Sequence, residues 1–488
     1  MIRQVAAALL AALAVTGCAT NPVSGRPNVV MGSMQGEKEQ SRRYYQEIIR
    51  AYGLYEDQAL QDYVQSVGER IAKNSHLPDW EWKFTVLDDE SINAFTTGGG
   101  YVYVHRGLLA YMTSEAELAG VLGHEIGHVT ARHPARRQTR GVLAGVLATG
   151  AAIMTGSSAV AQLANIGAEA WLQGYGRENE MEADRLGLEY ATKTGYRPEA
   201  MAEVFKVFKQ QESFELQRAK DEGREPRLYH GVFSSHPAPD ARMIQAAKGA
   251  ANVTTEPEGG WIDNRDAFMR AIDGMPYGTS RAQGIVRDNR FYHADMGITM
   301  AFPRGWTIEN HRDQILAYTK NKDAVMQITS PPRPDKKGPR EFLLERLKGA
   351  SISKGEALNV NGMEGYTLVT RRGSPLDGGE GPVRWVVLYR DKSTFLLGGA
   401  SRSAGAGLPA DDGLFLSSIQ TLRALKPSEY PLAQPYRIKV ITADANTKLE
   451  DYAKNVPVEK YQKEELQLLN GMYPNGKVKP GQYLKVVE

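Results

Sequence analysis

The sequence has a single cysteine and no excess of charge of either sign. Because Cys18 is the only cysteine among 488 residues, no intramolecular disulfide can form, and stability must come from hydrophobic cores. The 59 basic and 57 acidic residues give a net charge of +2, which provides no compositional argument for binding nucleic acid. At roughly 150 residues per domain, this length predicts about three domains.

Residues 141–168 contain no charged side chain and are long enough to cross a bilayer. Threonine, serine, glutamine and asparagine interrupt this stretch, however, and Gly156-Ser157-Ser158 would divide it into two short helices. We therefore expect a helical hairpin that rests on a membrane surface or screens a neighbouring cleft. A membrane span is the open alternative, because length alone does not establish insertion.

The segment His124-Glu125-Ile126-Gly127-His128 places two imidazoles four residues apart with a carboxylate beside them. Ser114 and Glu117 predict a capping box at the start of a helix that runs through this segment. On a helix, both histidines lie on one face, and this arrangement is typical of a zinc site with a glutamate as general base. The structural alternative is two ordinary histidines packed on a core.

A third zinc ligand is expected from Arg177-Glu178-Asn179-Glu180-Met181-Glu182-Ala183-Asp184. Glu180 and Asp184 are separated by one helical turn and can therefore face the same site. We predict that Glu180 ligates zinc and that Asp184 orients a ligand histidine from behind. Glu178 and Glu182 are expected to be solvated helix carboxylates.

These motifs together resemble gluzincin metallopeptidases of the group that contains HtpX-like heat-shock proteases and CAAX prenyl proteases. The shared elements span about residues 21 to 245. They are, in chain order, Asn21-Pro22-Val23-Ser24-Gly25, Ile92-Asn93-Ala94-Phe95 running into Gly98-Gly99-Gly100-Tyr101-Val102-Tyr103, the two motifs above, and Ser235-His236-Pro237 followed by Asp240 and Arg242. The most similar subgroup is the periplasmic lipoprotein-type proteases of outer-membrane protein quality control. The resemblance implies a mainly helical zincin domain with a small sheet, one zinc ion per chain and endopeptidase activity.

The metzincins, another class of zinc peptidases, extend the histidine motif differently. Their pattern would require glycine at position 131 and histidine at position 134, where this chain has Ala131 and Pro134. His133 falls one residue short of the metzincin position. We therefore predict that His133 is a structural histidine at the end of the helix and not a metal ligand.

The expected ligand set of His124, His128 and Glu180 would leave the fourth position of a tetrahedral zinc ion open for water. Glu125 is then the expected general base. For His236 the resemblance implies one of two roles, which the sequence leaves open. It either stabilises the oxyanion of the reaction or occupies the fourth zinc position and keeps the enzyme latent. A loop histidine without a catalytic task is the third alternative.

Two predicted strands, residues 84–87 and 101–104, flank a run of three glycines. An exposed strand edge at this place would bind an extended polypeptide by strand addition. Gly98, Gly99, Gly100 and Tyr101 are accordingly the predicted substrate-binding residues. A glycine turn in a hairpin without substrate contact is the alternative.

The N-terminal residues 1–17 have the layout of a signal peptide, with Arg3 before an apolar segment, 5–15, that is too short to span a membrane. Val15-Thr16-Gly17-Cys18 resembles a bacterial lipobox, which predicts lipidation of Cys18 at the head of a tether over residues 18–37. No aspartate retention signal follows Cys18, so we expect attachment to the periplasmic face of the outer membrane in a Gram-negative host. An uncleaved segment with a free thiol is the alternative.

The predicted fold class is α+β, with a zinc metallopeptidase domain over residues 38–249. A linker with a connecting helix, 250–283, leads to an α+β accessory domain, 284–428, whose Pro303-Arg304-Gly305-Trp306 is similar to a turn of PsbP-like folds. A β-α-α-β module over 432–488 resembles LysM. Because Ala445-Asn446-Thr447 stands where LysM usually has Gly-Asp-Thr, peptidoglycan binding and simple packing are equal alternatives.

These observations lead us to expect a lipid-anchored periplasmic zinc endopeptidase that hydrolyses misfolded or misassembled periplasmic and outer-membrane proteins. A chaperone-like outer-membrane assembly factor with a largely latent metal site is an alternative from another class. A peptidoglycan-associated scaffold lipoprotein is a third. Glu125 argues against this third hypothesis, because a binding module needs no general base.

Overall fold

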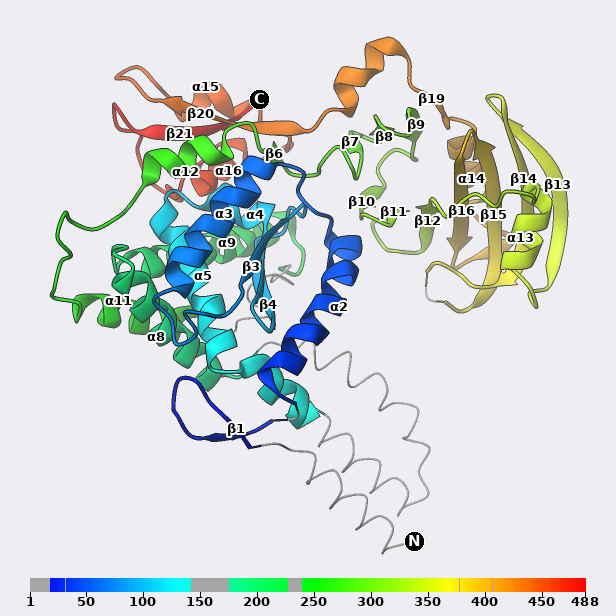
Figure 1. Cartoon of the computed structure of the whole chain (residues 1–488). Coiled ribbons are helices and arrows are strands. Elements are labelled where there is room, and N and C mark those ends of the chain that lie inside the picture. The colour runs from blue at the N-terminus through cyan, green and yellow to red at the C-terminus, as the bar shows by residue number, and fades with distance from the viewer. Residues whose placement is uncertain (1–17, 31, 142–174, 227–238, 377, 406) are drawn as a thin grey trace, which may run out of the picture. The chain divides into compact units, whose positions relative to one another are not determined.

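The computed structural model describes residues 18–30, 32–141, 175–226, 239–376, 378–405 and 407–488 (Figure 1). The chain divides into two compact units. Unit 1 combines Met1–Tyr277 with Tyr436–Glu488, and unit 2 is Gly278–Pro435. Both units contain helices and strands, which confirms mixed helix and sheet content. The predicted signal peptide and nearly all of the predicted hairpin over 141–168 lie outside the described residues.

Unit 1 is mainly helical and contains a small sheet, as predicted. The strands β3 (Lys83–Leu87), β5 (Tyr101–His105) and β4 (Ala94–Gly98) form the sheet in this order, with β3 parallel and β4 antiparallel to β5. Its helices of thirteen or more described residues are α2 (Met34–Tyr52), α3 (Gln58–Ala72), α5 (Glu115–Thr130), α8 (Arg177–Lys193), α9 (Ala200–Glu222) and α11 (Pro239–Ala251).

Helix α5 lies at the centre of unit 1, and all of its residues are buried. Ser114 caps its start, because the Ser114 hydroxyl accepts a hydrogen bond from the Glu117 backbone at 3.3 Å. The Glu117 carboxylate bonds back to the backbone N–H of Thr113 at 2.6 Å, one residue before the position that a capping box predicts. The predicted helix is confirmed, and only the partner of Glu117 differs.

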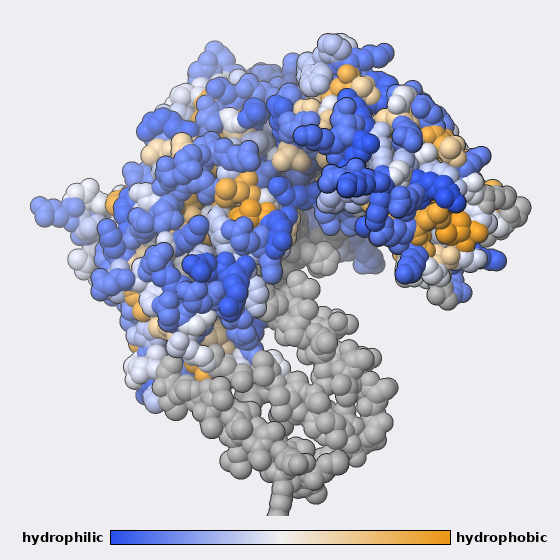
Figure 2. All heavy atoms as spheres, turned by 45° about the vertical axis from the view of Figure 1, so that its right-hand side comes forward, coloured by the Kyte–Doolittle hydropathy of each residue, from blue (hydrophilic) through white to orange (hydrophobic). Residues whose placement is uncertain are grey.

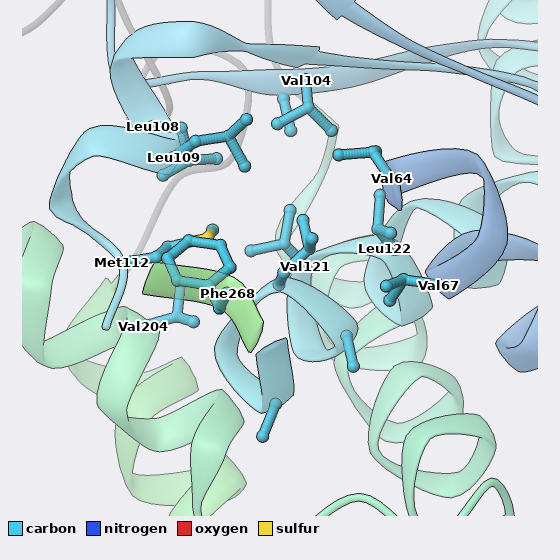
Figure 3. Packing of buried hydrophobic residues seen from close by; sticks show 14 of the residues in the cluster. Val64, Val67, Val104, Leu108, Leu109, Met112, Val121, Leu122, Val204 and Phe268 are labelled. Carbon is cyan, nitrogen blue, oxygen red and sulfur yellow. The ribbon is translucent and has the colours of Figure 1, made fainter. Parts of the chain in front are cut away.

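A hydrophobic core packs against the side of α5 that faces the sheet (Figure 3). Its members come from α3, β5, α4 (Arg106–Tyr111), α5, α9 and α12 (Arg265–Ile272), together with the α4–α5 connection. The side chains labelled in the figure are Val64, Val67, Val104, Leu108, Leu109, Met112, Val121, Leu122, Val204 and Phe268. Because each such side chain contributes about 1.5–3 kcal/mol when buried, this core fixes α5 against the sheet.

The C-terminal residues complete unit 1 instead of forming a separate compact unit. Their elements are β20 (Tyr436–Thr442), α15 (Leu449–Ala453), α16 (Gln462–Leu469) and β21 (Tyr483–Val487), in the predicted β-α-α-β order. Strand β20 pairs with β21 and also with β6 (Pro276–Tyr277), the last strand before unit 2. Tyr277 and Tyr436 are direct partners, so the two chain ends that border unit 2 lie side by side in unit 1.

Lys485 on β21 is fully buried, which is unusual for lysine. Its ammonium group donates hydrogen bonds of 2.6 Å to the carbonyls of Ala110 and Met112, at the end of α4. Burial lowers the pKa of Lys485 to about 7, although the nearby carboxylate of Glu117 opposes this shift. The contact joins β21 to the end of α4 and the connection that leads to α5.

The described residues of unit 2 form three antiparallel sheets, the smallest of which pairs β17 (Ala404–Gly405) with β18 (Leu408–Pro409). The seven-stranded sheet has the order β10-β11-β12-β16-β15-β14-β13 and the four-stranded sheet the order β19-β9-β8-β7. Strands of the seven-stranded sheet are β10 (Thr307–Asn310), β11 (Gln314–Tyr318), β12 (Ala324–Thr329), β13 (Ile352–Val360), β14 (Met363–Arg372), β15 (Glu380–Arg390) and β16 (Ser393–Ser401). Those of the four-stranded sheet are β7 (Ile285–Arg287), β8 (Arg290–His293), β9 (Ile298–Ala301) and β19 (Arg423–Ala424). Helices α13 (Pro339–Arg346) and α14 (Asp412–Ile419) also belong to this unit.

The face drawn in Figure 2 is largely hydrophilic, with small hydrophobic patches between the polar areas. Among the residues that the structure describes, none of the helices combines the length and the hydrophobicity needed to cross a membrane.

We expect Lys485→Met to change how stability depends on pH. The folded-state pKa of Lys485, about 7, lies below the ordinary lysine value of 10.5, so the unfolded chain binds more protons between these values. Lys485 therefore adds stability as the pH rises through this window, by at most about 1.4 kcal/mol per pH unit. The variant should lack this rise and, near pH 9, be about 1–3 kcal/mol less stable because two buried carbonyls lose their donor. Urea unfolding at several pH values measures both effects, and parallel pH profiles would contradict the prediction.

Candidate metal and catalytic site

Helix α5 brings the two predicted histidine ligands together. His124 and His128 are one turn apart on α5, and their Nε2 atoms are 3.0 Å from each other. His128 is fully buried and His124 is 7% exposed. Both rings therefore present a nitrogen to the same shielded space.

Glu180 completes this cluster from α8. Its two carboxylate oxygens lie 3.6 Å from Nε2 of His124 and 3.5 Å from Nε2 of His128. One ligand atom from each of the three side chains lies within 4.8 Å of the others. Two ligand atoms that are each about 2.1 Å from a tetrahedral zinc ion would be about 3.4 Å apart, so these separations fit zinc.

The charges around the cluster also fit a divalent cation. Glu125, Glu180 and Asp184 supply three carboxylates, all nearly inaccessible to water, and Arg242 supplies one guanidinium. Burying such an excess of negative charge is costly unless a further cation balances it. His124, His128 and Glu180 would hold the zinc ion. Its two positive charges would balance the net negative charge that the three carboxylates and Arg242 leave.

Glycines allow α5 and α8 to approach closely enough for this cluster to form. A Cβ atom on Gly187 of α8 would lie 2.6 Å from the backbone nitrogen of His124. On α5, a Cβ on Gly123 would lie 2.8 Å from the Gly187 carbonyl oxygen, and one on Gly127 would lie 2.9 Å from that of Ala183. Any side chain at these positions would push the two helices apart.

Asp184 and Arg242 support His124 from behind. An Asp184 oxygen lies 2.8 Å from Nδ1 of His124, and Arg242 on α11 donates two 2.7 Å hydrogen bonds to the same carboxylate. Burial alone would raise the pKa of Asp184, but the bonds to Arg242 and His124 lower it to about 2. Arg242 also contacts Glu180 at 2.7 Å and lies over the ring of Phe205. Arg242 was predicted only as part of a motif, and its bridging role was not predicted.

Glu125 lies beside a small apolar cavity of about 40 Å³. His124, Asp184 and Arg242 contribute polar groups to the wall. The apolar side chains of the wall are Ala94, Leu108, Val121, Met201, Val204, Phe205 and Phe208, of which four lie on α9. The predicted general base thus borders a small cavity whose wall is mainly apolar.

Glu182 differs from the prediction of a solvated carboxylate. Its Oε2 lies 3.0 Å from Nε2 of His133 and accepts a 3.2 Å hydrogen bond from Arg136. The bond from His133 is the main cause that lowers the pKa of Glu182 to about 2. His133 is fully buried and is not among the three clustered ligand residues.

The glycine run Gly98-Gly99-Gly100 forms the tight turn between β4 and β5, with positive φ at all three residues. A Cβ on Gly99 would lie 2.5 Å from the backbone of Lys38, and one on Gly100 would lie 2.4 Å from the Glu81 carbonyl oxygen. These contacts explain why glycine stands there without invoking a substrate. Tyr101 is half-buried at the start of β5. Substrate binding by these four residues stays a prediction.

Of the two remaining predicted residues, His236 and Cys18, the structure describes only Cys18. His236, with Ser235 and Pro237, lies outside the described residues. Cys18 begins β1 (Cys18–Thr20), which pairs with β2 (Pro27–Val29), and its direct backbone partner is Val29.

Comparison with known proteins assigns the region that holds this site. Residues 58–250 match the model of peptidase family M48. The matched region is thus a domain similar to those of peptidase family M48. This domain contains all the clustered residues described above, and the zinc ion that the family uses agrees with the two imidazoles and one carboxylate found there.

Several relatives are similar to part of this chain. The beta-barrel assembly-enhancing protease of Yersinia pestis is 30% identical over 238 residues, which is 47% of this chain and 47% of the relative. The protein of the same name from Escherichia coli K12 is 30% identical over 44% of each chain. The mitochondrial metalloendopeptidase OMA1 of Schizosaccharomyces pombe is 33% identical over 37% of this chain and 54% of the relative. The chain thus spans about half the length of the relatives that it matches.

Among solved structures, cyanobacterial PsbP from Synechocystis sp. PCC 6803 matches 29% of this chain and 94% of its own length, with 15% identity. The TM-score is 0.22, which is too low to establish a shared fold. The predicted PsbP-like character of the accessory domain stays a prediction.

We expect Gly187→Ala to weaken zinc binding, because its Cβ would collide with the backbone of His124 and separate α8 from α5. Such overpacking costs about 1–3 kcal/mol of stability, and displacement of Glu180 should lower zinc affinity at least about tenfold. Competition with a chromophoric chelator measures the affinity. Gly413→Ala on α14 is the control, since no neighbouring atom lies within 4 Å of its added Cβ. This variant should keep the wild-type zinc affinity, and its stability should be unchanged or slightly higher. Wild-type zinc affinity in Gly187→Ala would show that the close helix contact is not required.

Proposed function

We propose that this chain is a zinc-dependent endopeptidase. The observation that carries the proposal is the meeting of His124, His128 and Glu180 within 4.8 Å in a buried site, with Glu125 on the same helix. Zinc held by these three residues would supply a Lewis acid that polarises the peptide carbonyl and makes water easier to deprotonate. The similarity of this region to peptidase family M48 supports the same reaction.

The side chains of the site have distinct roles in the proposed reaction. Glu125 accepts the proton of the attacking water and returns it to the leaving amine. Asp184, held by Arg242, accepts a hydrogen bond from Nδ1 of His124 and so keeps its Nε2 directed into the site. We propose His236 as the donor that stabilises the oxyanion, with zinc ligation in a latent state as the alternative role.

We infer that the substrates are unfolded or misassembled envelope proteins, outer-membrane proteins among them. The apolar cavity beside Glu125 supports this inference, because unfolded segments expose apolar side chains that folded proteins bury. The names of the bacterial relatives, beta-barrel assembly-enhancing proteases, point to the same substrate class. Strand addition near Gly98–Tyr101 is the proposed binding mode for an extended segment.

We propose that Cys18 is lipidated and holds the protein at the periplasmic face of the outer membrane. The signal-peptide layout supports this proposal. Three residues after Cys18, the buried side chain of Asn21 donates a 3.3 Å hydrogen bond to the carbonyl of Ala131, at the end of α5. An acyl chain on Cys18 would therefore hold the M48 domain close to the membrane rather than on a long flexible tether.

For the C-terminal residues 432–488 we propose a degenerate LysM-like module. The order β20, α15, α16 and β21 supports the resemblance. The buried contacts of Lys485 with the carbonyls of Ala110 and Met112 favour packing as its task, with peptidoglycan binding as the alternative.

Glu125→Gln should abolish cleavage of unfolded casein, with a loss of about 100-fold or more, while the purified protein keeps its zinc. His128→Ala and Glu180→Ala should lose both zinc and cleavage, because each removes a ligand. Zinc content by elemental analysis and peptide release measure the two properties side by side. Glu178→Gln is the matched control, since Glu178 is an exposed carboxylate near the start of α8.

The same assay separates the alternatives. His236→Ala should lower turnover if His236 stabilises the oxyanion, and should raise it if His236 blocks the zinc. Stoichiometric zinc without cleavage, in wild type and in His236→Ala alike, would instead favour the chaperone-like assembly factor.

Cys18→Ser should release the protein from the outer-membrane fraction of a Gram-negative host, because the acyl anchor can no longer be attached. Cell fractionation follows the protein, and mass spectrometry of the wild-type N-terminus tests for a lipid-modified Cys18. A wild-type protein that carries no lipid would refute the proposed anchor.

A further inference from the structure

The supports of the two histidine ligands differ in kind. Nδ1 of His124 faces the carboxylate of Asp184 at 2.8 Å, which is the usual partner of a metal-bound histidine. Nδ1 of His128 lies 2.8 Å from Nδ1 of a second histidine, His133. Nε2 of His133 in turn lies 3.0 Å from the Glu182 carboxylate. A carboxylate therefore stands behind each ligand, directly for His124 and through an intervening ring for His128.

We propose that His133 and Glu182 are positioning residues that fix the tautomer and ring orientation of His128. The proposal rests on the zinc site proposed above. His133 is fully buried and therefore cannot be an incidental surface neighbour. It acts through His128 and does not itself face the clustered ligand atoms.

The positions of the protons follow from the distances. Nε2 of His128 faces Glu180 and Nε2 of His124, so a zinc-binding His128 must have its lone pair there and its proton on Nδ1. Nδ1 of His128 then donates to Nδ1 of His133, which must be an acceptor. The proton of neutral His133 therefore lies on Nε2 and is donated to Glu182. Only this direction of donation leaves His128 able to bind a metal.

Glu182 is held in place at the far end of this chain of bonds. Arg136 donates to Glu182 at 3.2 Å and, through the same nitrogen, to the carbonyl of Ala131 at 2.9 Å. Tyr175 packs against the His128 ring itself, and the two rings are stacked at a centroid distance of 4.0 Å. The ring of His128 is thus restrained both in its plane and across its face. A ligand restrained in this way loses little conformational freedom when the metal binds.

The test compares His133→Leu with His133→Asn. Leucine fills the space without an acceptor, whereas the Oδ1 atom of asparagine is as many bonds from the backbone as Nδ1 and can accept from His128. Zinc affinity, measured against a chromophoric chelator, should fall about 10–100-fold in His133→Leu, and His133→Asn should restore most of the loss. The absorption spectrum of the cobalt-substituted protein should change in His133→Leu and stay close to wild type in His133→Asn.

Glu182 provides a second, independent measurement. Glu182→Ala should weaken zinc binding in the wild-type background and have no further effect in His133→Asn, because the link to Glu182 is already absent. Glu189→Ala is the matched control on the same helix. Glu189 pairs with Arg185 and Lys193 on the surface, so its loss should leave zinc affinity unchanged.

The outcomes distinguish this proposal from the proposed function. A wild-type protein that binds no zinc would refute the metal site itself. If the wild type binds zinc and cleaves casein, wild-type affinity in His133→Leu would overturn the relay alone. Equal losses in His133→Leu and His133→Asn, with equal losses of stability in the metal-free proteins, would show that His133 acts only by packing.

Discussion

The close approach of α5 and α8 is the constraint on which the site depends. Helices that meet through ordinary side chains keep their axes about 8–10 Å apart. Here Gly123, Gly127 and Gly187 let backbone meet backbone, which brings Glu180 within reach of both histidines. Each glycine weakens its own helix by about 1 kcal/mol relative to alanine. The helices are therefore less stable alone than they could be, and their stability comes from packing in the core around α5.

The close contact of α5 and α8 brings the carboxylates of Glu125, Glu180 and Asp184 together in a buried site, where they repel one another. Arg242 relieves part of the repulsion by bonding to Asp184 and Glu180, and it comes from α11, far along the chain from α5. The remaining negative charge favours a divalent cation. Because ligands and partners come from three helices, zinc would bind the assembled unit and not the unfolded chain, and so would stabilise unit 1 by mass action.

The sequence was sufficient for the parts of the site that depend on helical spacing. His124 and His128 meet because residues four apart share a face, and Glu180 and Asp184 obey the same rule on α8. The roles of Arg242, His133 and Glu182 depend on how separate helices pack, which local spacing does not encode. Glu182 was expected in solvent, and its position two residues from Glu180 on α8 does direct its side chain away from the metal ligands. That other direction leads to His133, beyond the end of α5.

The C-terminal residues show a similar division between local pattern and tertiary contact. Their strands and helices follow from sequence pattern, but Lys485 would be expected on the surface, and only the folded chain shows it bonded to α4. Since Tyr277 pairs with Tyr436, the chain leaves unit 1 after one strand, forms unit 2, and re-enters unit 1 at the neighbouring strand. Gln210 on α9, the helix that lines the cavity, donates to the Tyr473 carbonyl. Helix α9 is therefore held in part by residues that follow unit 2, so unit 1 is complete only when the chain has returned from unit 2.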